Sequence, residues 1–261
     1  MSKEPKMRGA LLIDSHAHLN EPVFVKLDEV VARAKNAAVG ACVVPAYDRD
    51  SLDRTFALAG RYPGFVFPAY GIHPWFAGDP VDVERVKECL DRGNAVAVGE
   101  IGLDFAAGHE RQECQIVLFR KQLEIAIEYH LPVIVHCRKA FDPLSGILSD
   151  YRGKLRGVMH SFSGSPEWMR RFLDLGFCIS FSGSVTRKSA RKYHRNAQAV
   201  PADRYLLETD APSIATESTP ASEVEPMHLV EIARKMAEIR NMEYGDICRE
   251  SSENAKNLFH L

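Results

Sequence analysis

The sequence predicts an α/β protein whose eight strands close into a (β/α)8 barrel. Three observations lead to this fold class. Eight short apolar runs alternate with longer stretches whose apolar residues repeat at helical spacing. Such alternation implies parallel strands joined by right-handed crossovers. Eight of these units in 261 residues match the usual size of the barrel. A doubly wound open sheet is the alternative fold.

The predicted strands are the short apolar runs, each of a length that suits a buried strand. They occupy residues 10–14, 40–46, 66–71, 95–100, 132–136, 157–160, 177–181 and 205–209. Because parallel strands share one polarity, the residues that follow each strand should gather at one rim of the barrel.

The clearest helical pattern covers residues 111–130. Its apolar residues fall on one stripe, made of Ile116, Phe119, Leu123 and Ile127. Another helix begins near Pro226, which suits a first turn, and a last helix covers 244–259. The stretch 211–225 is rich in Ser, Thr, Pro and Glu and is predicted to be an irregular loop. Since no linker divides the chain, we expect residues 1–261 to form a single barrel domain.

The charge balance limits the kinds of partner. With 33 basic and 35 acidic residues the chain carries a net charge of −2, which argues against a surface that is basic all over. A polyanionic partner must therefore be held by a local patch or by metal ions. There is no apolar run of membrane-spanning length and no signal-peptide core. We expect no membrane association, and nothing indicates an obligate protein partner.

The six cysteines indicate the compartment. They are scattered, form no Cys-x-x-Cys pair, and several sit in apolar runs. This usage is typical of reduced thiols in the core of a cytoplasmic protein.

Histidines and acids follow most of the predicted strands. The residues in question are His16, His18, His73, Glu100, His136, His160 and Asp210. For any one histidine alone, a hydrogen-bonded core residue is the simpler interpretation. Together they bring five of the ten histidines to one rim, and this pattern indicates a metal site.

The candidate ligands outnumber the positions around one ion. Four imidazoles with Glu100 and Asp210 are too many for one tetrahedral cation but suit two ions about 3.5–4 Å apart. Glu100, near the middle of the set, could bridge both ions. Mixed sites of this kind accept Zn²⁺, Mg²⁺ or Mn²⁺. In the first segment, the strand period of two is expected to turn Asp14, His16 and His18 to one side.

The motifs resemble those of the TatD family of metal-dependent hydrolases, within the amidohydrolase superfamily. The likeness rests on Asp14-Ser-His-Ala-His-Leu, Gly71-Ile-His-Pro-Trp, Gly99-Glu-Ile-Gly-Leu-Asp-Phe, Pro132-Val-Ile-Val-His-Cys-Arg, His160-Ser-Phe-Ser-Gly, Glu208-Thr-Asp-Ala-Pro and Glu253-Asn-Ala-Lys-Asn-Leu-Phe. These motifs span essentially the whole chain. The resemblance implies a (β/α)8 barrel with two divalent metals that hydrolyses phosphodiester bonds in DNA, a deoxyribonuclease.

The resemblance also implies a role for each residue. His16, His18 and Asp210 would bind the first metal. His136 and His160 would hold the second, and Glu100 would bridge. A water or hydroxide between the metals would be the nucleophile, because metal binding brings its pKa toward neutrality. Asp210 would take its proton. His73 would donate to a phosphate oxygen, and Asp14 would orient a ligand imidazole.

Arg138, Ser163 and Arg187 are the candidate contacts for DNA, either single-stranded or at its ends. Arg187, Arg191 and Arg195 are spaced to share one helical face, with Lys188 and Lys192 beside them. Such a face could track a phosphate backbone, and a solvated helix face is the alternative. Trp75 and Phe105 are candidate base-stacking surfaces, with ordinary packing as the alternative.

The loop after Asp210 departs from the family pattern. Ser213 stands where an aromatic is usual, and Glu223-Val-Glu-Pro stands in place of Arg-Asn-Glu-Pro. Glu217, Glu223 and Glu225 make the loop acidic, which is expected to weaken phosphate binding.

Two other functions remain open. The same metal design could act on an amide or ester, including the ester of an aminoacyl-tRNA, because a shared fold does not fix the bond that is cleaved. A non-catalytic, metal-stabilised binding protein fits less well. A structural site normally fills its coordination with protein ligands, whereas this set leaves room for water.

Overall fold

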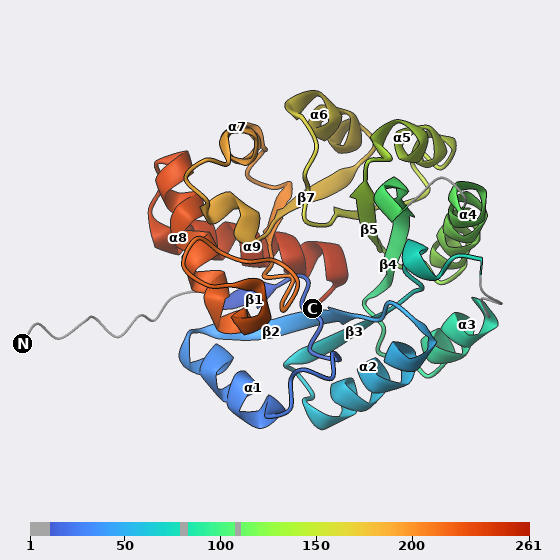
Figure 1. Ribbon diagram of the computed structural model, residues 1–261, viewed down its shortest axis with the longest axis horizontal. Helices are drawn as coiled ribbons and strands as arrows, with labels where there is room; N and C mark the ends of the chain where they lie inside the picture. The colour runs from blue at the N-terminus through green and yellow to red at the C-terminus, as the bar shows by residue number, and fades with distance from the viewer. Residues whose placement is uncertain (1–10, 79–82, 108–110) are drawn as a thin grey trace, which may run out of the picture.

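Eight parallel strands follow one another in the order β1 to β8, each hydrogen-bonded to the next (Figure 1). The computed structural model describes residues 11–78, 83–107 and 111–261. The strands are β1 (Leu12–Asp14), β2 (Val39–Pro45), β3 (Val66–Tyr70), β4 (Ala97–Asp104), β5 (Val133–Arg138), β6 (Gly157–Met159), β7 (Phe177–Phe181) and β8 (Tyr205–Leu207). The predicted barrel is confirmed. Ala10, where the first strand was predicted to begin, lies outside the described residues.

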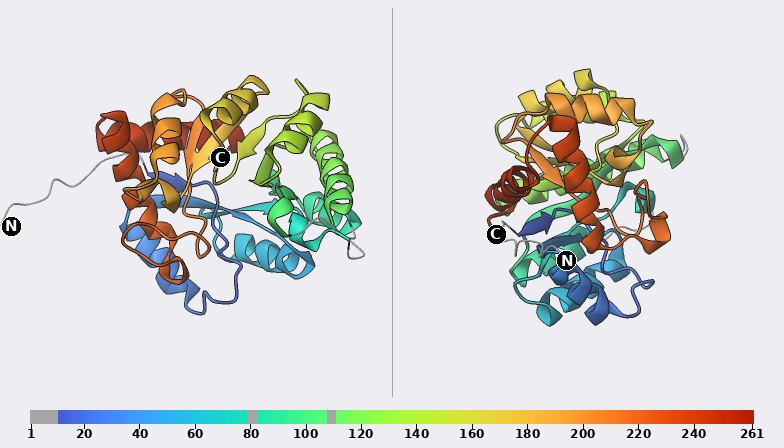
Figure 2. Two further views of the ribbon diagram at one scale, coloured as in Figure 1. Left: turned by 45° about the horizontal axis from the view of Figure 1, so that its top comes forward. Right: turned by 90° about the vertical axis from the view of Figure 1, so that its left-hand side faces the viewer.

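Helices surround the strands, as two further views also show (Figure 2). They are α1 (Leu27–Asn36), α2 (Arg49–Arg61), α3 (Val83–Asp91), α4 (Gln112–Glu128), α5 (Phe141–Asp150), α6 (Pro166–Asp174), α7 (Arg191–Ala199), α8 (Leu229–Arg240) and α9 (Tyr244–Phe259). The last helix has its predicted bounds. Pro226 opens a short 3-10 turn, η5 (Pro226–His228), that leads into α8. Among the described helices, none is long and apolar enough to cross a bilayer.

The barrel interior is filled by one cluster of apolar side chains toward the amino-terminal ends of the strands. The strands contribute Ile13, Ala41, Val43, Ala69, Ala97, Ile134, Val158, Cys178 and Leu206, and α9 contributes Ala255, Leu258 and Phe259. Because side chains alternate along a strand, the residues two positions after Ile134 and Val158 also face inward. This alternation places His136 and His160 above the apolar layer.

The two ends of the sheet meet just beyond β1 and β8. The Ser15 N–H donates to the Leu207 carbonyl at 3.0 Å, and the Asp210 N–H donates to the His16 carbonyl at 2.8 Å. Helix α9 packs against both strands, so the red carboxyl-terminal helix lies beside the blue β1 (Figures 1 and 2). The segments that carry His16 and Asp210 are therefore joined directly.

Strand β4 contains an irregularity beside Glu100. The pairing with β5 shifts between Val98 and Ile101, so that one extra residue lies on the β4 side. Ala97 faces the interior, and strict alternation would turn Glu100 outward. The extra residue reverses the alternation and leaves the Glu100 side chain buried among the histidines.

Gly102 allows β4 to approach β5 closely. Its φ is +145°, and a Cβ at this position would lie 2.0 Å from the His136 carbonyl oxygen. A side chain is therefore excluded both by backbone conformation and by space. The glycine lets Glu100 and His136 sit on adjacent strands at hydrogen-bonding distance.

All six cysteines are free thiols. Cys42, Cys89, Cys178 and Cys248 are buried, as the sequence predicts. Cys137 is only partly buried, and Cys114 is exposed on α4, so the prediction of a core position is wrong for Cys114. Its place on the outer face of an amphipathic helix explains the exposure.

Candidate metal centre

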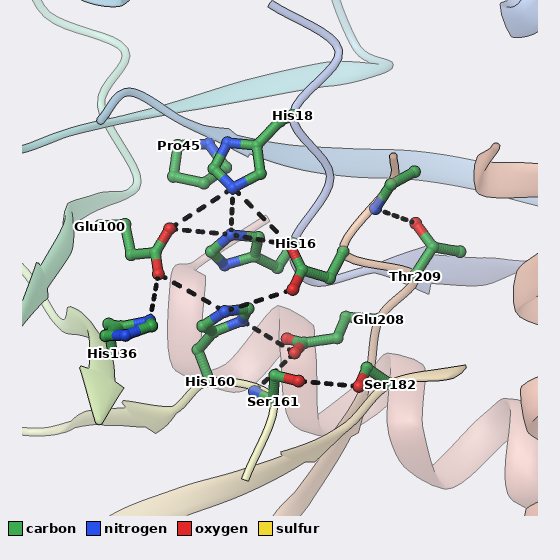
Figure 3. A network of polar contacts seen from close by, with 12 residues as sticks. His16, His18, Pro45, Glu100, His136, His160, Ser161, Ser182, Glu208 and Thr209 are labelled. Carbon is green, nitrogen blue, oxygen red and sulfur yellow. Dashed lines mark hydrogen bonds and ion pairs between the residues drawn. The ribbon is translucent and has the colours of Figure 1, made fainter. Parts of the chain in front are cut away.

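Four histidines and two carboxylates from five different strand ends converge in one buried place. Figure 3 shows His16, His18, His136 and His160 turned toward Glu100. Three groups have ligand atoms within 4.8 Å of one another: His16, His18 and Asp210; His16, Glu100 and His160; and His73, Glu100 and His136. Every residue predicted from the sequence to bind metal belongs to at least one group.

The first group places two imidazole nitrogens at one point. The Nε2 atoms of His16 and His18 are 3.0 Å apart. They lie 3.3 and 3.4 Å from Glu100 Oε2, and 3.9 and 3.7 Å from Asp210 Oδ1. Two imidazoles and two carboxylates thus share one small volume, as the ligands of a single cation do.

The other oxygen of Glu100 faces a second set of histidines. Glu100 Oε1 lies 3.0 Å from His136 Nδ1, 3.5 Å from His160 Nε2 and 3.6 Å from His73 Nε2. Asp210 Oδ2 is also 3.6 Å from His160 Nε2. The carboxylate of Glu100 therefore lies between two groups of imidazoles, one on each oxygen.

A carboxylate holds the outer nitrogen of two imidazoles in the second set, those of His136 and His160. His136 Nε2 lies 3.2 Å from Asp104 Oδ2, and His160 Nδ1 lies 2.8 Å from Glu208 Oε1. Glu208 Oε1 also accepts the Ser161 N–H at 2.6 Å (Figure 3). Such partners fix the ring orientation and make the inner nitrogen a better ligand.

The sequence assigned no role to Asp104 or Glu208. Both stand inside the strand-end motifs, four residues after Glu100 and two residues before Asp210. In the predicted strand 205–209, the period of two that turns Leu206 inward also applies to Glu208, and this signal could have identified it. The partner of each imidazole comes from another strand, however, and is visible only in the folded chain.

His73 is placed as a hydrogen-bond donor. Its Nδ1 accepts the backbone N–H of Trp75 at 3.2 Å, so the neutral ring carries its proton on Nε2. Burial lowers the pKa of His73 to about 3 and keeps the ring neutral. The Nε2–H points toward Glu100 Oε1, so His73 offers the site a proton rather than a lone pair.

The acidic ligands differ in their affinity for protons. Burial favours the protonated form of Glu100, but the imidazoles of His160, His73 and His16 outweigh it and hold its pKa well below the usual value. Burial raises the pKa of Asp210 to about 6, although His160 opposes this. Glu100 is therefore a permanent carboxylate, and Asp210 is poised near neutrality.

The imidazoles differ as well. Burial lowers the pKa of His16 to about 4, which leaves a neutral ring with a free lone pair. Burial also lowers the pKa of His160, but Glu208, Glu100 and Asp210 outweigh it and raise the pKa to about 10. A cluster of buried carboxylates that draws a proton onto a neighbouring imidazole provides a favourable environment for a cation.

The donor set fits divalent metal ions. Within the described residues, the inner atoms of the cluster are imidazole nitrogens and carboxylate oxygens, which Zn²⁺ and related ions bind. The Nδ1 atoms of His16 and His18 are buried and have no hydrogen-bond partner in the described part of the chain. The Nε2 atoms of these two rings, rather than Nδ1, face the shared volume.

Two glutamines of α4 hold the backbone at the ends of β3 and β4, beside the site. Gln122 accepts the Ile72 N–H at 2.7 Å and donates to the Ile72 carbonyl at 3.0 Å. Gln115 makes the same pair of bonds with Asp104, at 2.8 and 3.0 Å. Both side chains are buried, whereas Ile116 is only partly buried. The predicted stripe missed them, although two glutamines seven residues apart mark one helical face.

Asp14 does not orient an imidazole. Its carboxylate accepts the N–H and the hydroxyl of Thr209 at 2.9 and 2.6 Å, and the backbone N–H of His16 at 3.3 Å. Strand β1 ends at Asp14, with Ile13 facing the interior, so the alternation expected through His18 stops there. Asp14 instead ties the chain before His16 to the chain before Asp210.

The predicted substrate contacts lie outside the ligand cluster. Arg138 ends β5 and is exposed, with Nη1 3.9 Å from Asp104 Oδ2, and Ser163 is partly buried. Arg187 is exposed but does not share a helical face with Arg191, because its backbone is extended and α7 begins only at Arg191. The predicted basic face is wrong in this respect.

The acidic residues of the loop 211–225 have separate partners. Both oxygens of Glu225 accept hydrogen bonds from Arg33 of α1, at 2.6 and 2.8 Å. Glu217 accepts the backbone N–H of Lys188 at 3.3 Å. The charge of Glu225 is therefore balanced on the flank of the barrel, and Glu217 lies against the basic segment.

Comparison with known proteins gives one consistent result. The TatD related DNase family profile matches residues 13–260. YabD of Bacillus subtilis, an uncharacterized metal-dependent hydrolase, is 35% identical over 96% of this chain and 100% of its own length. The 3'-5' ssDNA/RNA exonuclease TatD of Erwinia billingiae is 32% identical over 96% of this chain and 99% of its own. The crystal structure of YjjV, a TatD homologue of Escherichia coli K12, covers 96% of this chain and 98% of its own with a TM-score of 0.87 and 32% identity.

Proposed function

The chain belongs to the TatD family of metal-dependent hydrolases, and on this premise we propose that it hydrolyses phosphodiester bonds in DNA with two divalent cations. The observation that carries the proposal is the position of Glu100, whose two oxygens face separate sets of histidines. A carboxylate in this position suits a bridge between two ions.

Each cation has its own ligands in this proposal. His16, His18 and Asp210 hold the first. His136 and His160, which both face Glu100 Oε1, hold the second, and Glu100 is shared. Zn²⁺, Mg²⁺ and Mn²⁺ all suit a mixed set of imidazoles and carboxylates. Bound divalent ions lower the pKa of a coordinated water and offset negative charge on phosphate oxygens.

In this proposal Asp210 accepts a proton, and His73 donates a hydrogen bond. The carboxylate of Asp210, with its pKa raised to about 6 by burial, accepts a proton from the attacking water. The Nε2–H of His73 donates to a phosphate oxygen, where negative charge grows as the bond breaks. Neither role requires a side chain from outside the described site.

DNA as the substrate is supported by a relative and by local charge. The relative from Erwinia billingiae is named as an exonuclease of single-stranded DNA and RNA. Arg138 places an exposed cation at the end of β5, two residues after His136 on the same strand. We propose single-stranded DNA or DNA ends as the substrate. A cytoplasmic location is consistent with the six free thiols.

The test uses purified protein with Mg²⁺, Mn²⁺ or Zn²⁺ in turn, and labelled single-stranded DNA beside a panel of esters, amides and an aminoacyl-tRNA. We expect DNA cleavage that is lost in Glu100→Gln. Hydrolysis of an ester or amide without DNA cleavage would contradict the proposed substrate. Elemental analysis should find about two ions per chain. A single tightly held ion would contradict the two-metal design.

A further inference from the structure

We propose that Trp75 is the surface on which a nucleobase of the substrate stacks beside the metal centre. This inference rests on the proposed function and names the nucleobase as the part of the substrate that the protein recognises. Aromatic side chains bind single-stranded nucleic acid in this way because every base presents a π-face. The position, exposure and rigidity of Trp75 all support the role.

Trp75 is a large apolar side chain left open to solvent at the catalytic rim. It lies in the turn η1 (Pro74–Phe76) directly after β3, and it is 55% exposed. Its ring meets the His73 ring at 4.5 Å between centroids and an angle of 70°. His73 in turn faces Glu100, so a single imidazole separates the indole from the bridging carboxylate.

The indole is fixed although it is exposed. Its Nε1–H donates to Asp104 Oδ2 at 2.8 Å, and its backbone N–H donates to His73 Nδ1. Asp104 is fully buried and also contacts the outer nitrogen of His136. A ring that is already held in place loses little conformational entropy when a ligand covers its face.

Arg138, beside the indole, suits the phosphate of a nucleotide. Arg138 approaches the same oxygen of Asp104 from the end of β5, with its Nη1 at 3.9 Å and its guanidinium largely exposed. A base on Trp75 would therefore have a cation near its phosphate. Phe105, the other aromatic that the sequence suggested as a base-stacking surface, is partly buried against the core and offers less free surface.

The chain allows a direct optical test. It has two tryptophans, and Trp168, on α6, is partly buried and stacks against Phe141 and Phe172. In a Trp168→Phe variant, Trp75 is the only source of indole fluorescence. The probe is a single-stranded tetranucleotide with phosphorothioate linkages that resist cleavage, compared with the same backbone carrying abasic sites.

We expect the probe with bases to quench the fluorescence of Trp75 and the abasic probe to leave it nearly unchanged. Trp75→Ala should weaken binding of the probe with bases about 10- to 100-fold, while Trp75→Phe should keep most of the affinity. The matched control is Phe56→Leu, since Phe56 is exposed on α2 and lies in a cavity lined by Phe259 at the opposite end of the barrel.

Equal quenching by both probes, or full affinity in Trp75→Ala, would overturn the inference. The separate cleavage assay on unmodified DNA distinguishes this from failure of the proposed function. If wild-type protein cleaves DNA but Trp75 does not respond, the hydrolase proposal stands and Trp75 has another role, such as contact with a second copy of the chain. If wild-type protein neither cleaves nor binds DNA, both proposals fail.

Discussion

The outer nitrogen of the His136 imidazole lies 3.2 Å from the buried carboxylate of Asp104, which comes from the neighbouring strand. Burial opposes the charge of Asp104, but hydrogen bonds from His136 and Trp75 outweigh it and lower its pKa to about 2. Asp104 is therefore charged near neutral pH. It holds His136 with Nδ1 facing Glu100.

Replacement of Asp104 by Asn should loosen the orientation of the His136 ring. The amide keeps the size of the side chain but loses the charge that fixes the His136 ring. We expect metal affinity to fall about 10- to 100-fold with little change in the melting temperature. Isothermal titration calorimetry measures the metal affinity, and scanning calorimetry measures the melting temperature. Asp142→Asn, at an exposed position on α5, is the control, and unchanged affinity in Asp104→Asn would refute the role.

The variant His73→Asn tests whether His73 donates a hydrogen bond or binds a metal ion. The Asn side chain can still accept the Trp75 N–H at this turn, as a capping residue does, but it lacks the Nε2–H of the imidazole. We expect the number of bound metal ions to stay the same while kcat falls about 10²-fold or more. Loss of one ion from the variant would show that His73 is a ligand instead.

Metal binding should release protons and strengthen with rising pH. His160 has a pKa of about 10 because Glu208, Glu100 and Asp210 outweigh burial, so its ring is protonated at pH 8 before metal binds. The ion must displace that proton. Below pH 6 Asp210 is protonated too, so apparent affinity should rise from pH 6 toward pH 10. Calorimetry in buffers of different ionisation enthalpy counts the protons.

Glu208→Gln tests the cause of that proton release. Without the charge of Glu208, the pKa of His160 falls, fewer protons are displaced at pH 8, and the pH dependence of affinity becomes flatter. Glu250→Gln is the control, because among the hydrogen bonds described Glu250 accepts only the one from the Tyr205 hydroxyl. Wild-type protein that binds metal at pH 8 without releasing protons would contradict the assignment.

Gly102→Ala should destabilise the barrel beside the site. The new Cβ would lie 2.0 Å from the His136 carbonyl oxygen at a φ of +145°. We expect the free energy of unfolding to fall by about 2–4 kcal/mol. Gly146→Ala, on α5 where a Cβ meets nothing within 4 Å, should raise it by about 0.5–1 kcal/mol. Urea denaturation of both variants provides the comparison, and equal stability would argue against close strand contact.

The sequence alone was enough to predict the barrel and the six candidate metal ligands. The strand-helix pattern depends on the spacing of apolar residues within each segment, which can be read locally. The rule that polar residues after parallel strands meet at one rim then identified all six, namely His16, His18, Glu100, His136, His160 and Asp210. The prediction failed where local spacing changed, as at Arg187, which precedes the helix it was assigned to.

Only the tertiary structure showed how those residues are held. The irregularity in β4 turns Glu100 inward, Asp104 and Glu208 bind the outer nitrogens of two histidines, and Trp75 fixes the proton of His73. Apart from the last, these contacts join different strands. Local periodicity reports the face of a residue but not its partner, because hydrogen bonds between segments are set only when the whole sheet closes.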